Sequence, residues 1–126
     1  MNNGIMIKSK SFAIRVIQLY QLLCDEKHEY VLSKQLLKSG TSIGANCREA
    51  SRAQSTPDFI AKLTIALKEA DETAYWLELL HETLYITDET FQSFYEEIDQ
   101  IIKILVKIIK KTKQNNSLLW TLNSEL

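Results

Sequence analysis

The stretch from Thr56 to Tyr85, TPDFIAKLTIALKEADETAYWLELLHETLY, predicts one long helix and decides the fold class. Pro57 suits the first turn of a helix, where its missing N–H costs nothing, and Thr56 is of a residue type that caps helices. Small or apolar side chains then recur at alternating steps of four and three residues: Phe59, Leu63, Ala66, Ala70, Thr73, Leu77, Leu80 and Leu84. This spacing is typical of a seam between packed helices.

The rest of the chain predicts three more helices of the same kind. Apolar periodicity and cap sequences place them at about 8–25, 29–54 and 91–113, the last introduced by Thr87-Asp88-Glu89-Thr90. Short connections between long helices make neighbours antiparallel. We therefore expect an all-α fold, an antiparallel up-down-up-down four-helix bundle over residues 1–113, followed by an apolar C-terminal tail over 114–126.

Gly40 and Gly44 conflict with the second predicted helix, because each costs about 1 kcal/mol relative to Ala in a helix interior. One interpretation is a loop over 38–41 that divides the chain into five helices. A continuous helix is favoured because polar side chains stay in phase across the supposed break, namely Gln35, Ser39, Ser42, Asn46 and Glu49. The small residues would then let a neighbouring backbone approach closely.

Composition limits the classes of function. With 126 residues, 45% of them hydrophobic and 25% charged, the chain has the make-up of one globular domain. Its net charge of −1 lacks the basic excess usual in nucleic-acid-binding proteins, so such a role needs a local patch. Cys24 and Cys47 form no metal or disulfide pattern and are expected to be reduced and buried. No signal peptide or membrane span is indicated, so we expect a cytoplasmic protein.

No group of residues predicts an active site. Glu78 and His81 share a helix face at the spacing of di-iron bundles, but such a site needs a second pair and two further glutamates. Ser39, Ser42 and Cys47 have no histidine nearby in sequence to activate them. The glycines of the second helix are not followed by the lysine of a phosphate loop. We expect no catalytic residue, cofactor, metal or small-molecule substrate.

Polar side chains on the second and third predicted helices need partners, because a line of polar groups facing another helix must be satisfied by it or by water. We expect a network that fixes helix register, with Asn46 bonded to a carboxylate of the third helix. Its members are Gln35, Ser39, Ser42, Asn46, Glu49, Glu69 and Glu72. A binding site is the alternative interpretation.

Charge is unevenly divided between these two helices. Residues 30–54 carry four basic side chains against one acidic, whereas 57–86 carry two basic against six acidic. The four basic residues are Lys34, Lys38, Arg48 and Arg52, and each pair is one helical turn apart. They are candidates for nucleic-acid phosphates. The alternative, which we favour, is salt bridges to the acidic third helix of the same or a neighbouring subunit.

The fourth predicted helix is apolar around more of its circumference than one core needs. The surplus on this helix and on the tail predicts an oligomer interface formed by Ile102, Ile104, Ile109, Leu118, Leu119 and Trp120. The tail could instead fold back on its own bundle. Docking on a neighbour is favoured, because a ring repeats one heterologous contact.

Two stretches resemble a known family. EYVLSKQ at 29–35 and KSGTSIGANCREA at 38–50 are similar to the signature of four-helix bundle proteins encoded in intervening sequences of bacterial 23S ribosomal RNA genes. IALKEADET at 65–73, with its flanking residues, is similar to that family's third helix. The resemblance implies a bundle that assembles into a ring, commonly a pentamer, with no enzyme activity. It also implies a relationship to the accessory variability determinant proteins of diversity-generating retroelements, which associate with a reverse transcriptase and nucleic acid.

From these patterns we predict a non-enzymatic, homo-oligomeric scaffold or adaptor. Its client would be nucleic acid or a nucleic-acid-processing protein. The alternative is a protein-binding module that makes no contact with nucleic acid.

Overall fold

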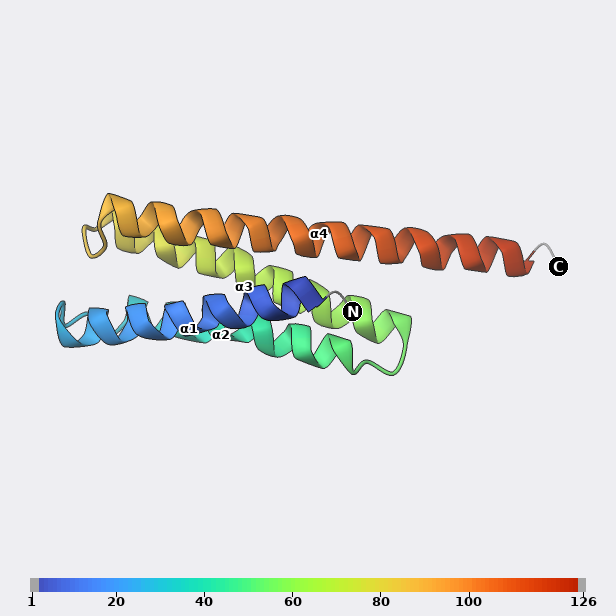
Figure 1. Cartoon of the computed structure of the whole chain (residues 1–126), viewed down its shortest axis with the longest axis horizontal. Helices are drawn as coiled ribbons and strands as arrows, with labels where there is room; N and C mark the ends of the chain where they lie inside the picture. Colours follow the sequence, from blue (N-terminus) through green and yellow to red (C-terminus); the bar gives the residue numbers. More distant parts are fainter. Residues whose placement is uncertain (1–2, 125–126) are drawn as a thin grey trace.

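The computed structural model describes residues 3–124, with side chains described for 4–116, and every regular element in that range is a helix. The elements are α1 (Asn3–Asp25), α2 (Leu32–Ser51), α3 (Thr56–Glu82) and α4 (Asp88–Ser124). Short connections at alternating ends join them, so that neighbours run antiparallel (Figure 1). The prediction of an all-α four-helix bundle is confirmed. No described helix combines the length and hydropathy needed to cross a bilayer.

The core is a single layer between the helices, to which all four contribute. Its largest fully buried side chains are Ile5, Phe12, Val16, Leu23, Leu36, Ile43, Leu63, Leu77, Leu80, Ile98, Ile101 and Leu105. The predicted seam of α3 is buried from Leu63 to Leu80. Leu84 was wrongly included in it, because α3 ends at Glu82 and Leu84 is 87% exposed with a φ of 68°.

The second helix is continuous through both glycines, as predicted. A Cβ on Gly40 would lie 2.8 Å from Cγ1 of Val16, which is fully buried in α1. A Cβ on Gly44 would instead lie 3.4 Å from Oγ of Ser9, an ordinary contact. Gly40 is therefore required for the close approach of α1 and α2, and Gly44 is not.

The helix starts are fixed by side-chain caps. The carboxylate of Glu29 accepts hydrogen bonds from the backbone N–H groups of residues 31, 32 and 33 at 3.1, 2.9 and 2.7 Å. Burial of this carboxyl opposes its ionisation, but the three amides outweigh that effect and lower its pKa. Ser55, not the predicted Thr56, caps α3 by accepting the N–H of Asp58. Thr87 caps α4 as predicted, by accepting the N–H of Thr90 at 3.1 Å.

The bundle is tightest between α2 and α3 and loosest between α1 and α4. Arg15 of α1 contacts three residues of α4 across this looser interface. Its guanidinium forms an ion pair with Glu97, donates to Oγ of Ser93 at 2.9 Å and lies 4.1 Å from the ring centre of Phe94. The last helix runs on past the ends of the other three (Figure 1) and continues through the predicted boundary at residue 113 without a break.

Candidate nucleic-acid interface

The four basic residues predicted as phosphate contacts are all exposed; three of them lie on α2, and Arg52 is the residue that directly follows its last turn. At 3.6 residues per turn, Lys34, Lys38, Arg48 and Arg52 fall within about a quarter of the helix circumference. The sequence prediction that they share a face is consistent with their exposure. Along the helix, however, Lys34 and Arg48 are about 21 Å apart, so the two pairs form separate positive regions.

Arg48 and Arg52 line a groove of about 680 Å³ at the end of the bundle where α2 connects to α3. Lys10 of α1 and Lys62 of α3 line the same groove. We call this feature, defined by Lys10, Arg48, Arg52 and Lys62, the basic groove. Its acidic lining residues are Glu49 and Asp58, so four positive charges face two negative ones. Sequence reasoning missed Lys10 and Lys62 because they belong to other helices and share no local spacing with the arginines.

The floor of the basic groove is formed by small side chains. Ser9 and Ala13 of α1 face Thr41, Gly44 and Ala45 of α2 across it. Because these side chains are short, the longer cationic side chains stand around a shallow depression. Such a shape suits an extended, negatively charged chain better than a bulky apolar ligand.

The cations of the basic groove form no ion pair in the structure. Between residues 4 and 116, the salt bridges are Arg15–Glu97, His81–Asp88 and Lys103–Asp99. None of them joins α2 to α3, so the expected neutralisation of α2 by the acidic third helix of the same chain does not occur there. A weaker interaction between the charges of α2 and α3 is present at Glu69. Burial and the charge of Glu72 raise the pKa of Glu69, and the positive charge of Lys38 on α2 partly opposes that rise.

The predicted polar network is smaller than expected. Its cross-helix hydrogen bond joins the hydroxyls of Ser39 and Thr73, 2.9 Å apart and both buried. Thr73 is also hydrogen-bonded to the carbonyl oxygen of Glu69 within α3, at 2.8 Å. The hydrogen-bonding partner of α2 on the third helix is therefore this threonine and not one of the predicted glutamates. Asn46 donates to the carbonyl oxygen of Ser42 within its own helix, which corrects the expected bond to a carboxylate of α3.

The other predicted members of the network lie at or near the surface. Gln35, Glu49 and Glu72 are exposed, and Glu69 is half-buried. Ser42 donates to the carbonyl oxygen of Lys38 at 2.7 Å, again within α2. Helix register between α2 and α3 therefore depends on the Ser39–Thr73 pair and on apolar packing.

Glu78 and His81 do not act as a pair, because each is hydrogen-bonded to a different residue. Glu78 accepts a hydrogen bond from the hydroxyl of Tyr95 at 2.9 Å, and this bond raises the pKa of Tyr95. His81 is bonded through Nε2 to Asp88 at 2.7 Å and stacks on Phe91, with ring centres 4.2 Å apart. In the part of the chain that the structure describes, no three potential metal-ligating side chains of His, Cys, Asp or Glu come together.

Comparison with known protein families assigns the chain to one of them. The model of the 23S rRNA-intervening sequence protein family matches residues 1–107. The chain belongs to this family. A similar fold occurs in the crystal structure of a protein of unknown function from the S23 ribosomal protein family of Bacteroides thetaiotaomicron, with a TM-score of 0.85 and 56% sequence identity over 86% of this chain and 96% of that one. No curated protein matches the chain.

The bundle also leaves apolar side chains uncovered. Ile7, Ile14 and Ile17 form an exposed stripe on α1, and Val106 is exposed on α4. Of the predicted oligomer contacts, Ile102 and Ile104 are half-buried. Ile109 is a correction, since it is 9% exposed and belongs to the core of its own bundle. The side chains of Leu118, Leu119 and Trp120 lie outside the described residues.

Proposed function

We propose that this 23S rRNA-intervening sequence protein is a non-enzymatic, homo-oligomeric scaffold that binds nucleic acid along the basic groove. The observation that carries the proposal is the convergence of Lys10, Arg48, Arg52 and Lys62 from three helices without ion pairs among the described residues. Unpaired surface cations repel one another, and phosphates relieve that repulsion while releasing counterions into solution.

The local charge of the groove matters more than the charge of the whole chain. The net charge of −1 reflects acidic side chains of α3 and α4, most of which do not line the basic groove, whereas the groove itself carries four basic residues against Glu49 and Asp58. At physiological ionic strength, charges further away than about 8 Å are largely screened. A phosphate in the groove is therefore affected mainly by the four cations and two carboxylates of the lining, whose balance is positive.

The homo-oligomeric part of the proposal is supported by the uncovered apolar side chains of α1 and α4. A stripe containing Ile7, Ile14 and Ile17 is a surface that water solvates poorly and that a second copy can cover. The family resemblance implies a ring, commonly a pentamer. A ring would present one basic groove per subunit, and linked sites bind a long polyanion more tightly than a single site does.

The rival function is a protein-binding module that makes no contact with nucleic acid. In that case the outer face of α2, with Lys34, Lys38, Arg48 and Arg52, would pair with an acidic surface of another protein or of another subunit's α3. The rival predicts that neutralising the basic groove weakens protein association. Our proposal predicts that it weakens nucleic-acid binding and leaves association unchanged.

The test is the binding of a fluorescently labelled single-stranded RNA, measured by anisotropy across a salt series. Contact with four phosphates predicts a fall in affinity of about fifty-fold between about 50 and 200 mM salt, from a slope of about −0.7 per phosphate. Replacing Arg48 and Arg52 by Gln should abolish most of the binding and flatten the salt dependence. Adding Lys34→Gln and Lys38→Gln should remove the remainder.

A second pair of variants tests the groove as distinct from the face of α2. Lys10→Gln with Lys62→Gln should weaken binding about as much as the double arginine variant, because both pairs line the same depression. The matched control is Lys68→Gln with Lys103→Gln, which removes two positive charges from exposed positions elsewhere. Equal loss in the control, or no binding by the parent protein at low salt, would contradict the proposal.

A further inference from the structure

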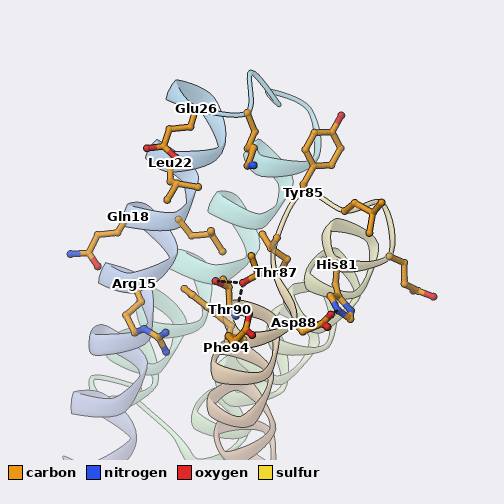
Figure 2. Close-up of a pocket in the computed structure, with 16 residues that line it drawn as sticks. Arg15, Gln18, Leu22, Glu26, His81, Tyr85, Thr87, Asp88, Thr90 and Phe94 are labelled. Carbon is orange, nitrogen blue, oxygen red and sulfur yellow. Dashed lines mark hydrogen bonds and ion pairs between the residues drawn. The ribbon is translucent and has the colours of Figure 1, made fainter.

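A second groove, of about 1030 Å³, opens at the opposite end of the bundle from the basic groove. It lies between the last turns of α1 and the connection from α3 to α4 (Figure 2). Leu19 and Leu22 of α1 line one side, and Tyr85, Ile86 and Phe94 line the other. We call this feature, defined by these five residues, the end groove. Leu19, Ile86 and Phe94 are buried there, whereas Leu22 is 42% exposed and Tyr85 is half-buried, so these last two side chains form the open apolar surface of the groove.

The rim of the end groove is acidic. Glu26, Glu82, Asp88 and Glu89 surround it, and the basic residues beside them are Lys27 and Arg15. The guanidinium of Arg15 is already paired with Glu97. Asp88 is bonded to Nε2 of His81, so the carboxylates left on the rim are Glu26, Glu82 and Glu89 against Lys27. This negative balance favours a cationic occupant.

Leu84 also lies on the rim of the end groove and adds an exposed apolar side chain to it. Its φ of 68° lies in the left-handed region, which leucine rarely adopts, and its side chain is 87% exposed. The turn that holds it is well bonded, because the N–H groups of Leu84 and Tyr85 donate to the carbonyl oxygens of His81 and Leu80 at 3.1 and 2.9 Å. A strained backbone that holds a large apolar side chain in water marks a contact surface.

The chain itself contains a segment of the complementary chemistry. No acidic residue occurs between Asp99 and Glu125, whereas this part of the chain includes Lys103, Lys107, Lys110, Lys111 and Lys113. The described lysines are exposed on α4. After them the sequence becomes apolar, with Leu118, Leu119, Trp120 and Leu122. The helix α4 runs on past the ends of the other three helices (Figure 1).

A chain cannot place this segment in its own end groove. The groove lies where α4 begins, and the apolar part of the segment starts 24 residues after Phe94, about 36 Å further along the helix. Contact between them must therefore join two copies of the chain. Such a contact is heterologous, because different surfaces meet, and it can repeat from subunit to subunit.

We propose that the C-terminal part of α4 of one subunit docks in the end groove of the next. The apolar residues after Asn116 cover Leu22, Leu84 and Tyr85, and the lysines before it pair with the acidic rim. This inference rests on the proposed homo-oligomer and adds to it the two surfaces that meet.

The test is a charge exchange followed by native mass spectrometry of the full chain. Glu82→Lys with Glu89→Lys reverses the rim, and Lys110→Glu with Lys111→Glu reverses the helix. All four positions are exposed, so the fold should be retained. Each pair alone should raise the dissociation constant of the assembly about tenfold or more, since like charges then meet. All four substitutions together should restore the assembly.

The control is Asp71→Lys with Glu72→Lys, the same reversal at exposed positions of α3 away from the end groove. It should leave the assembly intact. The inference is overturned if the rim variant assembles as the parent does, if the fourfold variant fails to recover while circular dichroism shows it folded, or if only the α3 control disrupts assembly. A monomeric parent chain would overturn the proposed homo-oligomer as well, whereas the other outcomes leave it standing.

Discussion

The substitution Gly40→Ala tests most sharply how α1 and α2 fit together. Alanine in a helix interior is favoured over glycine by about 1 kcal/mol, so on propensity alone the change should stabilise the protein. The new Cβ, however, would lie 2.8 and 2.9 Å from the two γ-carbons of Val16, well inside the 3.5 to 4.0 Å that carbon atoms prefer. Val16 is fully buried and β-branched, so it cannot turn away.

The two effects can be compared in magnitude. Overpacking of this kind costs about 1 to 3 kcal/mol, which exceeds the gain in helix propensity. We therefore expect Gly40→Ala to lower the free energy of unfolding by about 1 kcal/mol, with a range of about 0 to 2. Gly44→Ala is the matched control, because its Cβ would meet Ser9 at 3.4 to 3.5 Å without overlap. It should stabilise the protein by up to about 1 kcal/mol.

Urea unfolding followed by circular dichroism measures both changes, at one fixed protein concentration because assembly contributes to stability. A third variant identifies the cause. Val16→Ala should cost about 1 to 2 kcal/mol less in the Gly40→Ala background than in the parent, because it removes the clash as well as the packing. The same sign for both glycine substitutions, or the same cost of Val16→Ala in both backgrounds, would refute the proposed close approach.

Three further outcomes are expected. Glu29→Gln should destabilise the protein by about 1 kcal/mol at pH 7. Because folding lowers the pKa of Glu29, the parent's advantage is fully present above the ordinary value of 4.5 and is lost as the pH falls through the lowered value, so a difference in unfolding free energy that does not shrink as the pH falls below 4.5 would contradict the capping role. Ser39→Ala should lower the free energy of unfolding by about 1 kcal/mol, and adding Thr73→Val should lower it little further, because both hydroxyls are then removed together. Losses that add up over the two substitutions in thermal melts would argue against the hydrogen bond between them. Arg15→Met should lower the free energy of unfolding by about 1 kcal/mol or less, because its ion pair with Glu97 is partly exposed. Native-state hydrogen exchange should show the loss at the facing turns of α1 and α4, and a change confined to α2 would contradict this.

The helices were predictable because their signals are local. Leu63 and Leu80 of α3 fall on one face through the repeat of the helix itself, and this repeat holds whatever else the chain does. The continuity of α2 through Gly40 was predictable for the same reason. The cap of α3 was not, because Ser55 and Thr56 are both capping types and Pro57 is tolerated at either of the first two helical positions.

The candidate site was only partly predictable because it depends on how three helices meet. Arg48 and Arg52 are one turn apart, and their shared face follows from that spacing. Lys10 and Lys62 join them only through the crossing of α1 and α3 with α2, which no local pattern encodes. In the same way, Thr73 looked like one more small residue of a seam. Its role as the partner of Ser39 depends on the register between two helices.

The assembly surface was predictable in kind and not in detail. An excess of apolar residues on α4 is visible in the sequence, but which of them the core uses depends on where α1 and α3 end. Ile109 is taken by the core, while Ile7 and Ile14 of α1 are left exposed. A helix-by-helix count of apolar residues cannot distinguish these cases.

The central claim is that one assembly of identical subunits carries nucleic acid on its basic grooves. Sedimentation velocity of the full-length chain with a fluorescent single-stranded RNA, recorded at low and at high salt, tests it most directly. The account predicts an oligomer of 14.5 kDa subunits that carries the RNA at low salt, and an oligomer of unchanged size without the RNA at high salt. A monomer under both conditions, or an oligomer with which the RNA never sediments, would contradict it.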